Sequence, residues 1–263
     1  MLRIALIGAG RMGQAIVSEI ATSPDLILAG VCVREGGESA AITRLSALGV
    51  SPDVPVLSRP QDILRNADVV VDFSLPDACE SVANAAGRQG IPLVCGLTGI
   101  DARGRSALRD ASAHIPVLYE RNMSLGIAVM QGLVRQAASV LGSDFSASIA
   151  ETHHRHKRDA PSGTALQLGE VLAAGRGQPF DSVYYYDQDG TLGPPAAGDI
   201  VYSVTRQGEN PGEHSVIFAS DNEVLELTHR VTNRRVFAQG ALRAAAWLVS
   251  QPAGYYGLSD LVA

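Results

Sequence analysis

The chain opens with MLRIALIGAGRMGQAIVSEI, and the glycines of this stretch constrain the fold more than any other feature. Residues 2–7 form a short apolar run that is typical of a buried parallel strand. The run ends at Gly8, Gly10 and Gly13, in G-x-G-x-x-G order, and an amphipathic helical pattern starts at about Arg11. A strand, a tight glycine turn and a helix predict a dinucleotide-binding unit, because bare backbone admits a pyrophosphate and free helix amides face it. A purely structural glycine turn is the alternative.

The next expected strand, residues 26–33, carries the information on the cofactor. An acidic residue at the end of this strand is typical of NADH sites, whereas an arginine nearby accommodates the 2′-phosphate of NADPH. Here Val33 precedes Arg34, and Glu35 follows. We therefore expect NADPH as the preferred cofactor with NADH possible; the alternative is that Arg34 is a solvated loop residue.

Alternation of strand and helix patterns continues to about residue 122. Strands are expected at 67–74, 91–99 and 115–124, and helices at about 76–89 and 101–113. Repeated units of this kind predict a parallel, doubly wound sheet that binds its ligand at the carboxyl ends of the strands. The residues expected to bind the cofactor are Gly8, Gly10, Arg11, Met12, Gly13, Arg34, Phe73, Ser74, Gly96, Leu97, Thr98, Arg121, Asn122 and Met123.

After a helical stretch at about 124–142 the pattern changes. Residues 145–154 alternate as a sheet strand does, and residues 214–220 and 223–231 predict an antiparallel pair. The Gly- and Pro-rich region 187–212 is interpreted as long loops. The tail, 236–251, is helical and is expected to pack back on the first domain.

Composition excludes several classes of function. The 263 residues contain 21 Lys and Arg against 27 Asp and Glu, a net charge of −6, which disfavours nucleic acid as a partner. No apolar run approaches the roughly 20 residues that span a bilayer, and the first residues lack the basic start of a secretory signal. Cys32, Cys79 and Cys95 have no C-x-x-C spacing. We expect a cytoplasmic protein that interacts neither with membranes nor with nucleic acid.

The stretch ETHHRHKRDAPSGTA, residues 151–165, concentrates the candidate chemistry of the second half. Pro161-Ser162-Gly163-Thr164 is expected to begin a helix, with Pro in an early position and Ser or Thr as its cap. The loop would bring His154, Lys157 and free helix amides together, and this arrangement favours an anion such as a dicarboxylate or a phosphate. A histidine beside the anion can donate a proton near neutral pH.

Other interpretations of this cluster stay open. Neighbouring residues of a strand point to opposite faces, so His153 and His154 share a role only if the strand has already ended. A zinc site is disfavoured, because Lys157 and Arg158 are cations and no compact set of four ligands is present. A solvated basic loop without function is the remaining alternative.

The same stretch closely resembles the signature of bacterial dihydrodipicolinate reductases. The resemblance extends over the whole chain and includes GAGRMG, CGLTG, NMSLGI, RQGENPGEH and FAQGALRAAAWL. It implies an α/β fold: an N-terminal Rossmann-like domain, residues 1–122 completed by 235–263, and a C-terminal α+β domain with a mixed sheet, 123–234. The second domain would bind substrate and form a homotetramer, and hinges near 122–125 and 232–236 would close the domains over the substrate.

The resemblance also implies a reaction and roles for residues. A nicotinamide cofactor would reduce 4-hydroxy-tetrahydrodipicolinate, a cyclic dicarboxylate, in the diaminopimelate route to lysine. His153 would donate the proton, with Lys157 as its catalytic partner. The substrate-binding residues would be His154, Lys157, Ser162, Gly163, Thr164 and Arg234, and no metal is implied.

Four departures from the family pattern are visible: a glycine turn one residue shorter, Val33 for an acidic residue, Ala128 for Asn, and Arg121 for a small residue or Pro. Rival functions are a Rossmann reductase of another amino-acid-derived imine, of the aspartate dehydrogenase type, and a non-catalytic NADP-binding protein. A reductase of another imine should lack the combination of the HHxxK and PSGT motifs. A non-catalytic NADP-binding protein should lack one or more residues of the acid cluster, whereas His153 and Lys157 are both present here. A metal hydrolase would be sensitive to chelators.

Overall fold

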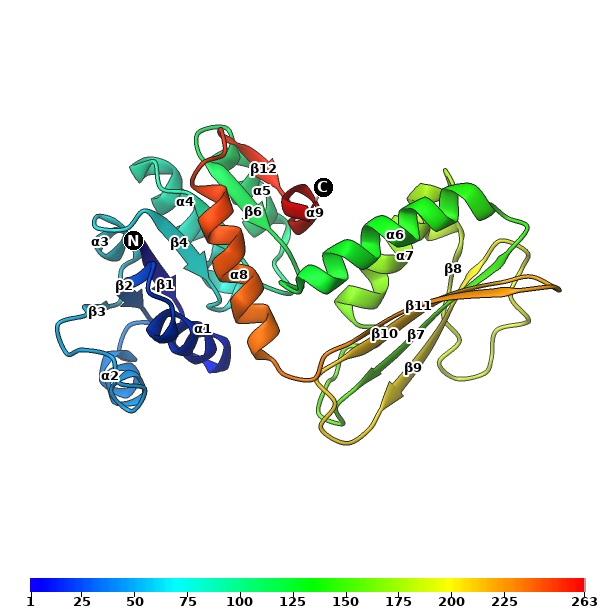
Figure 1. Cartoon of the computed structure of the whole chain (residues 1–263), viewed down its shortest axis with the longest axis horizontal. Helices are drawn as coiled ribbons and strands as arrows, with labels where there is room; N and C mark the ends of the chain where they lie inside the picture. Colours follow the sequence, from blue (N-terminus) through cyan, green and yellow to red (C-terminus); the bar gives the residue numbers. More distant parts are fainter. Residues whose placement is uncertain (263) are drawn as a thin grey trace. The chain divides into compact units, whose positions relative to one another are not determined.

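The computed structural model describes residues 1–262, which form two compact units (Figure 1). Unit 1 comprises Met1–Leu125 together with the described residues from Arg235 onward, and unit 2 comprises Gly126–Arg234. Each unit has a hydrophobic core of its own. The first boundary lies three residues beyond the expected end of the first domain at 122.

Unit 1 is built on a seven-stranded sheet with the order β12-β6-β5-β4-β1-β2-β3. All of its pairings are parallel, as the repeated strand–helix pattern predicted. The strands are β1 (Leu2–Ile7), β2 (Leu26–Cys32), β3 (Val56–Leu57), β4 (Val69–Asp72), β5 (Leu93–Cys95), β6 (Pro116–Tyr119) and β12 (Gly254–Tyr256).

Helices cover both faces of this sheet. Ala5 and Ile7 of β1 belong to the core formed with α3, α4 and α5, whereas Ile4 and Leu6, equally buried, point to the other face, where α1 and α8 lie. A parallel sheet buried on both sides confirms the doubly wound class. The helices are α1 (Arg11–Thr22), α2 (Glu38–Ser46), α3 (Pro60–Leu64), a 3₁₀ turn η1 (Pro76–Ala78), α4 (Cys79–Gln89), α5 (Ala102–Ser112), α8 (Arg235–Leu248) and α9 (Leu258–Val262).

Unit 2 has a five-stranded mixed sheet with the order β11-β10-β7-β9-β8. The central strand β7 pairs antiparallel with β10 and parallel with β9. Helices α6 and α7 cover one face and bury Ile149, Val216 and Phe218 of the sheet. The elements are α6 (Leu125–Leu141), β7 (Ser146–His153), α7 (Gly163–Gly175), a 3₁₀ turn η2 (Phe180–Ser182), β8 (Tyr184–Tyr185), β9 (Ile200–Arg206), β10 (Glu213–Ala219) and β11 (Val224–Arg230).

Some expectations about individual elements were wrong. Region 187–212 is not all loop, because β9 lies inside it; its alternation of buried Tyr202 with exposed Ser203 was obscured by the Gly- and Pro-rich residues before it. The tail helix ends at Leu248, and β12 follows as an edge strand of the first sheet. Pro161 lies outside α7, which begins at Gly163 with Ser162 as its cap. The antiparallel pair β10–β11 is confirmed.

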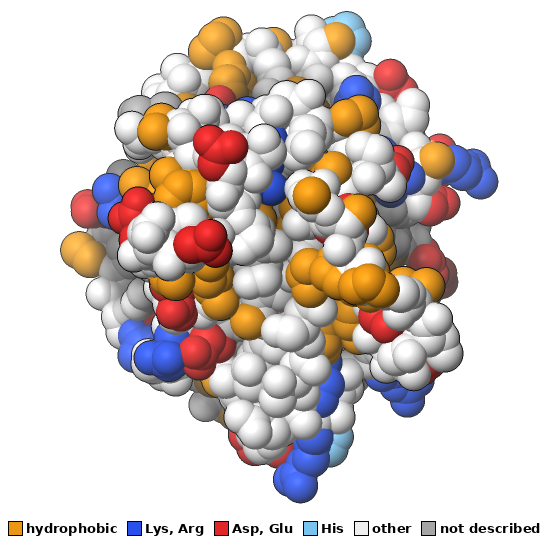
Figure 2. All heavy atoms as spheres, turned by 90° about the vertical axis from the view of Figure 1, so that its right-hand side faces the viewer, with side chains coloured by type: hydrophobic (Ala, Val, Ile, Leu, Met, Phe, Trp, Pro, Cys, Tyr) orange, Lys and Arg blue, Asp and Glu red, His pale blue; other side chains and the backbone are white. Residues whose placement is uncertain are grey.

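Hydrophobic, acidic and basic side chains are intermixed on the face of the molecule drawn in Figure 2. Among residues 1–262, none of the helices combines the length and the apolar character needed to cross a membrane.

Candidate active site

The glycine turn of unit 1 uses its three glycines for two different reasons. Gly8 has a φ of +96°, and a Cβ there would lie 2.7 Å from the carbonyl oxygen of Phe73. A Cβ on Gly13 would lie 2.1 Å from the carbonyl oxygen of Gly8, so α1 packs directly on the turn. No atom lies within 4 Å of a Cβ built on Gly10. Packing within the chain therefore requires Gly8 and Gly13, while Gly10 leaves open space at the start of α1, where a phosphate would bind.

The loops after β4 and β5 meet beside this turn. The ring of Phe73 covers Gly96, where a Cβ would lie 2.3 Å from Phe73 Cζ. Ser74 donates its backbone N–H to Asp72 Oδ1 at 2.9 Å, and burial raises the pKa of Asp72 to about 6. These contacts hold the backbone of two predicted cofactor loops at the carboxyl edge of the sheet.

The other predicted cofactor residues differ in what they present. Arg11 begins α1 and Arg34 follows β2, and both side chains are exposed, as an anion-binding role requires. Leu97 and Met123 are buried, so they offer a ligand only their main chain. The remaining members, Met12, Thr98, Arg121 and Asn122, are exposed or partly exposed at the same edge.

In unit 2 the cation cluster lies at the carboxyl end of β7. The strand ends at His153, so His154 already belongs to the loop. The rule that neighbouring strand residues point to opposite faces therefore does not apply to His154. Lys157 donates its backbone N–H to the carbonyl of His154 and forms an ion pair with Asp159 at 2.7 Å. Burial lowers the pKa of His154, and the nearby charge of Arg234 lowers it further. The structure thus brings His154, Lys157 and Arg234 into one region of unit 2.

The N-terminus of α7 adds backbone donors to this region. Ser162 caps the helix, with its Oγ accepting from the N–H of Ala165 at 3.2 Å. The first helical hydrogen bond runs from Leu166 N–H to the carbonyl of Ser162, so the amides of Gly163 and Thr164 precede the helical ladder. The Ser162 hydroxyl itself is engaged inside the protein, 3.2 Å from His214 Nε2.

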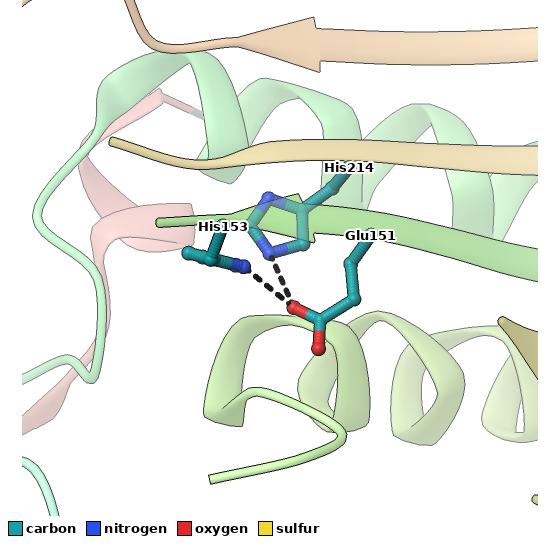
Figure 3. Close-up of side chains that lie close together, drawn as sticks. All are labelled: Glu151, His153 and His214. Carbon is teal, nitrogen blue, oxygen red and sulfur yellow. Dashed lines mark ion pairs between the residues drawn. The ribbon is translucent and has the colours of Figure 1, made fainter. Parts of the chain in front are cut away.

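Three residues of this region were not predicted: Glu151, Arg206 and His214. Glu151 Oε2 lies 2.8 Å from His153 Nδ1 and 3.7 Å from His214 Nε2. Figure 3 shows both histidines beside this carboxylate oxygen. Glu151 Oε1 accepts hydrogen bonds from Arg206 Nη2 at 2.8 Å and from Ser162 N–H at 2.9 Å. Glu151 stands in the quoted motif, and Arg206 and His214 are the first and last residues of RQGENPGEH, but no local pattern shows that strands more than 50 residues apart meet.

The carboxylate and the two histidines lie close enough to be considered as metal ligands, with their three atoms within 4.8 Å of one another. Ion pairs and hydrogen bonds explain the arrangement as well, since Glu151 faces a guanidinium, an amide and an imidazole. A dication here would compete with Arg206 for the same carboxylate. The geometry therefore favours an acid–base pair.

A glycine-turn dinucleotide unit joined to a unit with a histidine–carboxylate pair and clustered cations is the architecture of a pyridine-nucleotide oxidoreductase. Residues 2–123 match the family model described as "Dihydrodipicolinate reductase, N-terminus", and residues 126–262 match the model described as "Dihydrodipicolinate reductase, C-terminus". The chain belongs to the dihydrodipicolinate reductase family.

Individual relatives agree with this assignment. The chain is 39% identical over 261 residues to the 4-hydroxy-tetrahydrodipicolinate reductase of Sulfurimonas denitrificans, covering 99% of this chain and 98% of that protein. It is 40% identical over 261 residues to the enzyme of the same name from Pseudoalteromonas translucida, covering 99% and 97%. A dipicolinate-bound dihydrodipicolinate reductase from Paenisporosarcina sp. TG-14 has the same fold, with a TM-score of 0.75 at 22% identity and 99% of both chains covered.

His214 should make stability depend on pH. Burial, reinforced by the charge of His153, lowers its pKa from 6.5 to about 3. Between these values the unfolded chain binds a proton that the folded chain excludes, so the free energy of unfolding should fall as pH decreases from 6.5 toward 3. His214→Asn should flatten this slope in urea unfolding followed by circular dichroism. The control is His156→Asn, since the His156 side chain is 70% exposed. An unchanged slope in His214→Asn would contradict the assignment.

Proposed function

We propose that this chain reduces 4-hydroxy-tetrahydrodipicolinate to tetrahydrodipicolinate with NAD(P)H, in the diaminopimelate route to lysine. Membership of the dihydrodipicolinate reductase family supports the reaction. The main support is the group of residues at the end of β7. His153 is paired there with Glu151, and Lys157, His154 and the N-terminus of α7 lie nearby. To bind and reduce a cyclic dicarboxylate, a site needs cations and amides that bind the carboxylates and an acid that protonates the ring carbon. This region offers all of them.

The roles divide between binding and proton transfer. His154, Lys157, Arg234 and the amides of Gly163 and Thr164 hold a substrate carboxylate, in the way that helix termini and cations bind anions. A nicotinamide cofactor, when bound, supplies the hydride. Hydride addition places negative charge on the conjugated ring of the substrate, and His153 neutralises it by donating a proton, with Lys157 stabilising the charge. Ser162 supports binding through the cap of α7, because its hydroxyl is turned inward.

The experiment that tests this proposal follows the absorbance of NADPH and NADH while a condensing synthase forms the substrate from pyruvate and aspartate semialdehyde. Oxidation that depends on the synthase is expected. If folded protein that binds NADPH oxidises neither cofactor, another imine substrate or a non-catalytic NADP-binding role would replace the proposal.

His153→Gln should lower kcat by about 10²–10⁴, the usual contribution of a general acid, because glutamine cannot give up a proton. NADPH affinity, measured by fluorescence titration, should stay within a few-fold of wild type, since the cofactor binds through residues of unit 1. A large loss of NADPH affinity with little loss of kcat would remove His153 from the role of donor.

We further propose that the protein prefers NADPH over NADH, because Arg34 binds the 2′-phosphate. Arg34→Ala should weaken NADPH by about 10- to 100-fold, the loss of a charge-assisted hydrogen bond, and should leave NADH nearly unchanged. Titration of both cofactors measures this, with Arg88→Ala, another exposed arginine of unit 1, as the control. Equal losses for both cofactors would refute the contact.

We include a cytoplasmic homotetramer in the proposal, assembled through the sheet of unit 2. Helices α6 and α7 cover only one face of that sheet, and the other face carries small or mixed side chains, with Ala150 between Ser203 of β9 and Ser215 of β10. A flat face of this kind is suited to packing against another sheet. The three cysteines are buried free thiols, which is compatible with the cytoplasm.

Light scattering should give the mass of four chains. Ala150→Arg places a charge at the centre of the open face and should yield smaller species. The control is Val140→Arg on α6, at a side chain that is already 78% exposed. A tetramer that survives Ala150→Arg would exclude this face as the interface.

A further inference from the structure

The described region contains a buried carboxylate, Glu151, for which the proposed reaction has no stated use. Glu151 lies on β7 two residues before His153, so both side chains point to the same face of the strand. Its side chain is 0% exposed. An unpaired carboxylate at such a position would strongly destabilise the folded protein. Glu151 therefore needs specific partners that compensate its charge.

The two oxygens of this carboxylate have different partners. Oε1 receives Arg206 Nη2 at 2.8 Å and the backbone N–H of Ser162 at 2.9 Å. Oε2 faces His153 Nδ1 at 2.8 Å, and His214 lies further away (Figure 3). Oε1 is thus fixed by a guanidinium and an amide that keep the carboxylate plane in place, and Oε2 is left to meet the histidine.

The carboxylate stays ionised. Burial by itself would raise the pKa of Glu151, but hydrogen bonds from His153, Ser162 and Arg206 hold that pKa well below the ordinary range. An ionised carboxylate can only accept hydrogen bonds, so its position 2.8 Å from His153 Nδ1 favours the tautomer in which this nitrogen carries the hydrogen.

We propose that Glu151 is a positioning residue that holds the Nδ1–H of His153 and leaves Nε2 as the atom that donates the proton; this inference rests on the proposed function, in which His153 is the donor. In the step, the Nε2–H bond breaks and a C–H bond forms at the substrate carbon that hydride addition has made electron-rich. The electron pair of the broken bond stays on Nε2. His153 then remains as the neutral Nδ1–H tautomer on Glu151 and regains its proton from solvent.

The surroundings of Nε2 agree with this assignment. A Cβ built on Gly212 would lie 3.0 Å from His153 Nε2, so a glycine stands where a side chain would crowd the donating atom. The ring of His214 contacts the His153 ring edge to face, with centroids 5.0 Å apart, and fixes its plane. Because the pKa of His214 is lowered to about 3, chiefly by burial, the His214 ring is neutral at pH 7.

Several other groups could move the pH response of the pair and must be considered with it. They come from every element packed around it: Arg206 of β9, His214 of β10, His229 of β11, and Lys157, Asp159, His154 and Arg234 of the loops. His153 Nδ1 itself faces Glu151 Oε2 at 2.8 Å.

The test compares Glu151→Gln with wild type in three readouts. We expect kcat to fall by about 10², a large share of the general-acid contribution, with the substrate KM within about threefold. The pH profile of kcat should differ between the two proteins, because the variant removes a negative charge 2.8 Å from His153 Nδ1. Long-range ¹H–¹⁵N spectra of ¹⁵N-histidine-labelled protein, with His153 assigned through His153→Gln, should show neutral Nδ1–H in wild type and its loss in Glu151→Gln.

Two further variants separate positioning from structural support. Glu223→Gln, an exposed glutamate in the β10–β11 turn, should leave kcat and the profile unchanged. Arg206→Gln removes a partner of Glu151 but keeps the Glu151–His153 pair, so it should retain the wild-type tautomer. NADPH binding and circular dichroism check that each variant is folded.

The outcomes distinguish a positioning role of Glu151 from structural support. An unchanged profile and an unchanged tautomer in Glu151→Gln would overturn the proposal, even if kcat fell, because that result means structural support alone. Loss of Nδ1–H in Arg206→Gln to the same extent as in Glu151→Gln would overturn it as well. If wild type shows no synthase-dependent oxidation, the proposed reaction fails, and the tautomer spectra still show whether Glu151 holds Nδ1–H.

Discussion

A negative charge removed from water is the constraint around which unit 2 is organised. Glu151 is fully buried, and its carboxylate is compatible with the folded state only because a guanidinium, a helix-cap amide and an imidazole converge on it. These partners come from β9, from the start of α7 and from β7 itself. The strand pairing and the docking of α7 must both be correct before this charge is satisfied, so one interaction connects the sheet, the helix and His153.

The same interaction fixes the register of the sheet. Glu151 lies opposite His214 on β10, and His153 lies opposite Arg206 on β9. A slip of one residue would turn each of these side chains to the other face, away from α7 and from one another. Hydrophobic neighbours such as Ile149 and Val216 select the same register by burial. Packing and charge compensation thus agree, and this consistency gives the sheet a single arrangement.

The sequence was sufficient for the parts of the fold that local pattern encodes. The glycine turn, the parallel order of unit 1 and the β10–β11 pair follow from periodicity, and the histidine motif follows from resemblance. Strand β9 was missed because loop-forming residues surround it, and β12 because a three-residue strand has no periodicity of its own. Glu151 was visible in the motif, but its use depends on Arg206, 55 residues away, and a single sequence contains no signal for that contact.

In the proposed reaction, the balance of charges around Glu151 changes when His153 gives up its proton. With His153 protonated, the cluster holds two positive charges, His153 and Arg206, against one negative charge, Glu151, while His214 is neutral because its pKa is about 3. Donation from Nε2 leaves Arg206 against Glu151, a neutral pair in a buried site. Arg206 thus compensates the charge of Glu151 in the state that follows the proposed donation, while the carboxylate orients the imidazole.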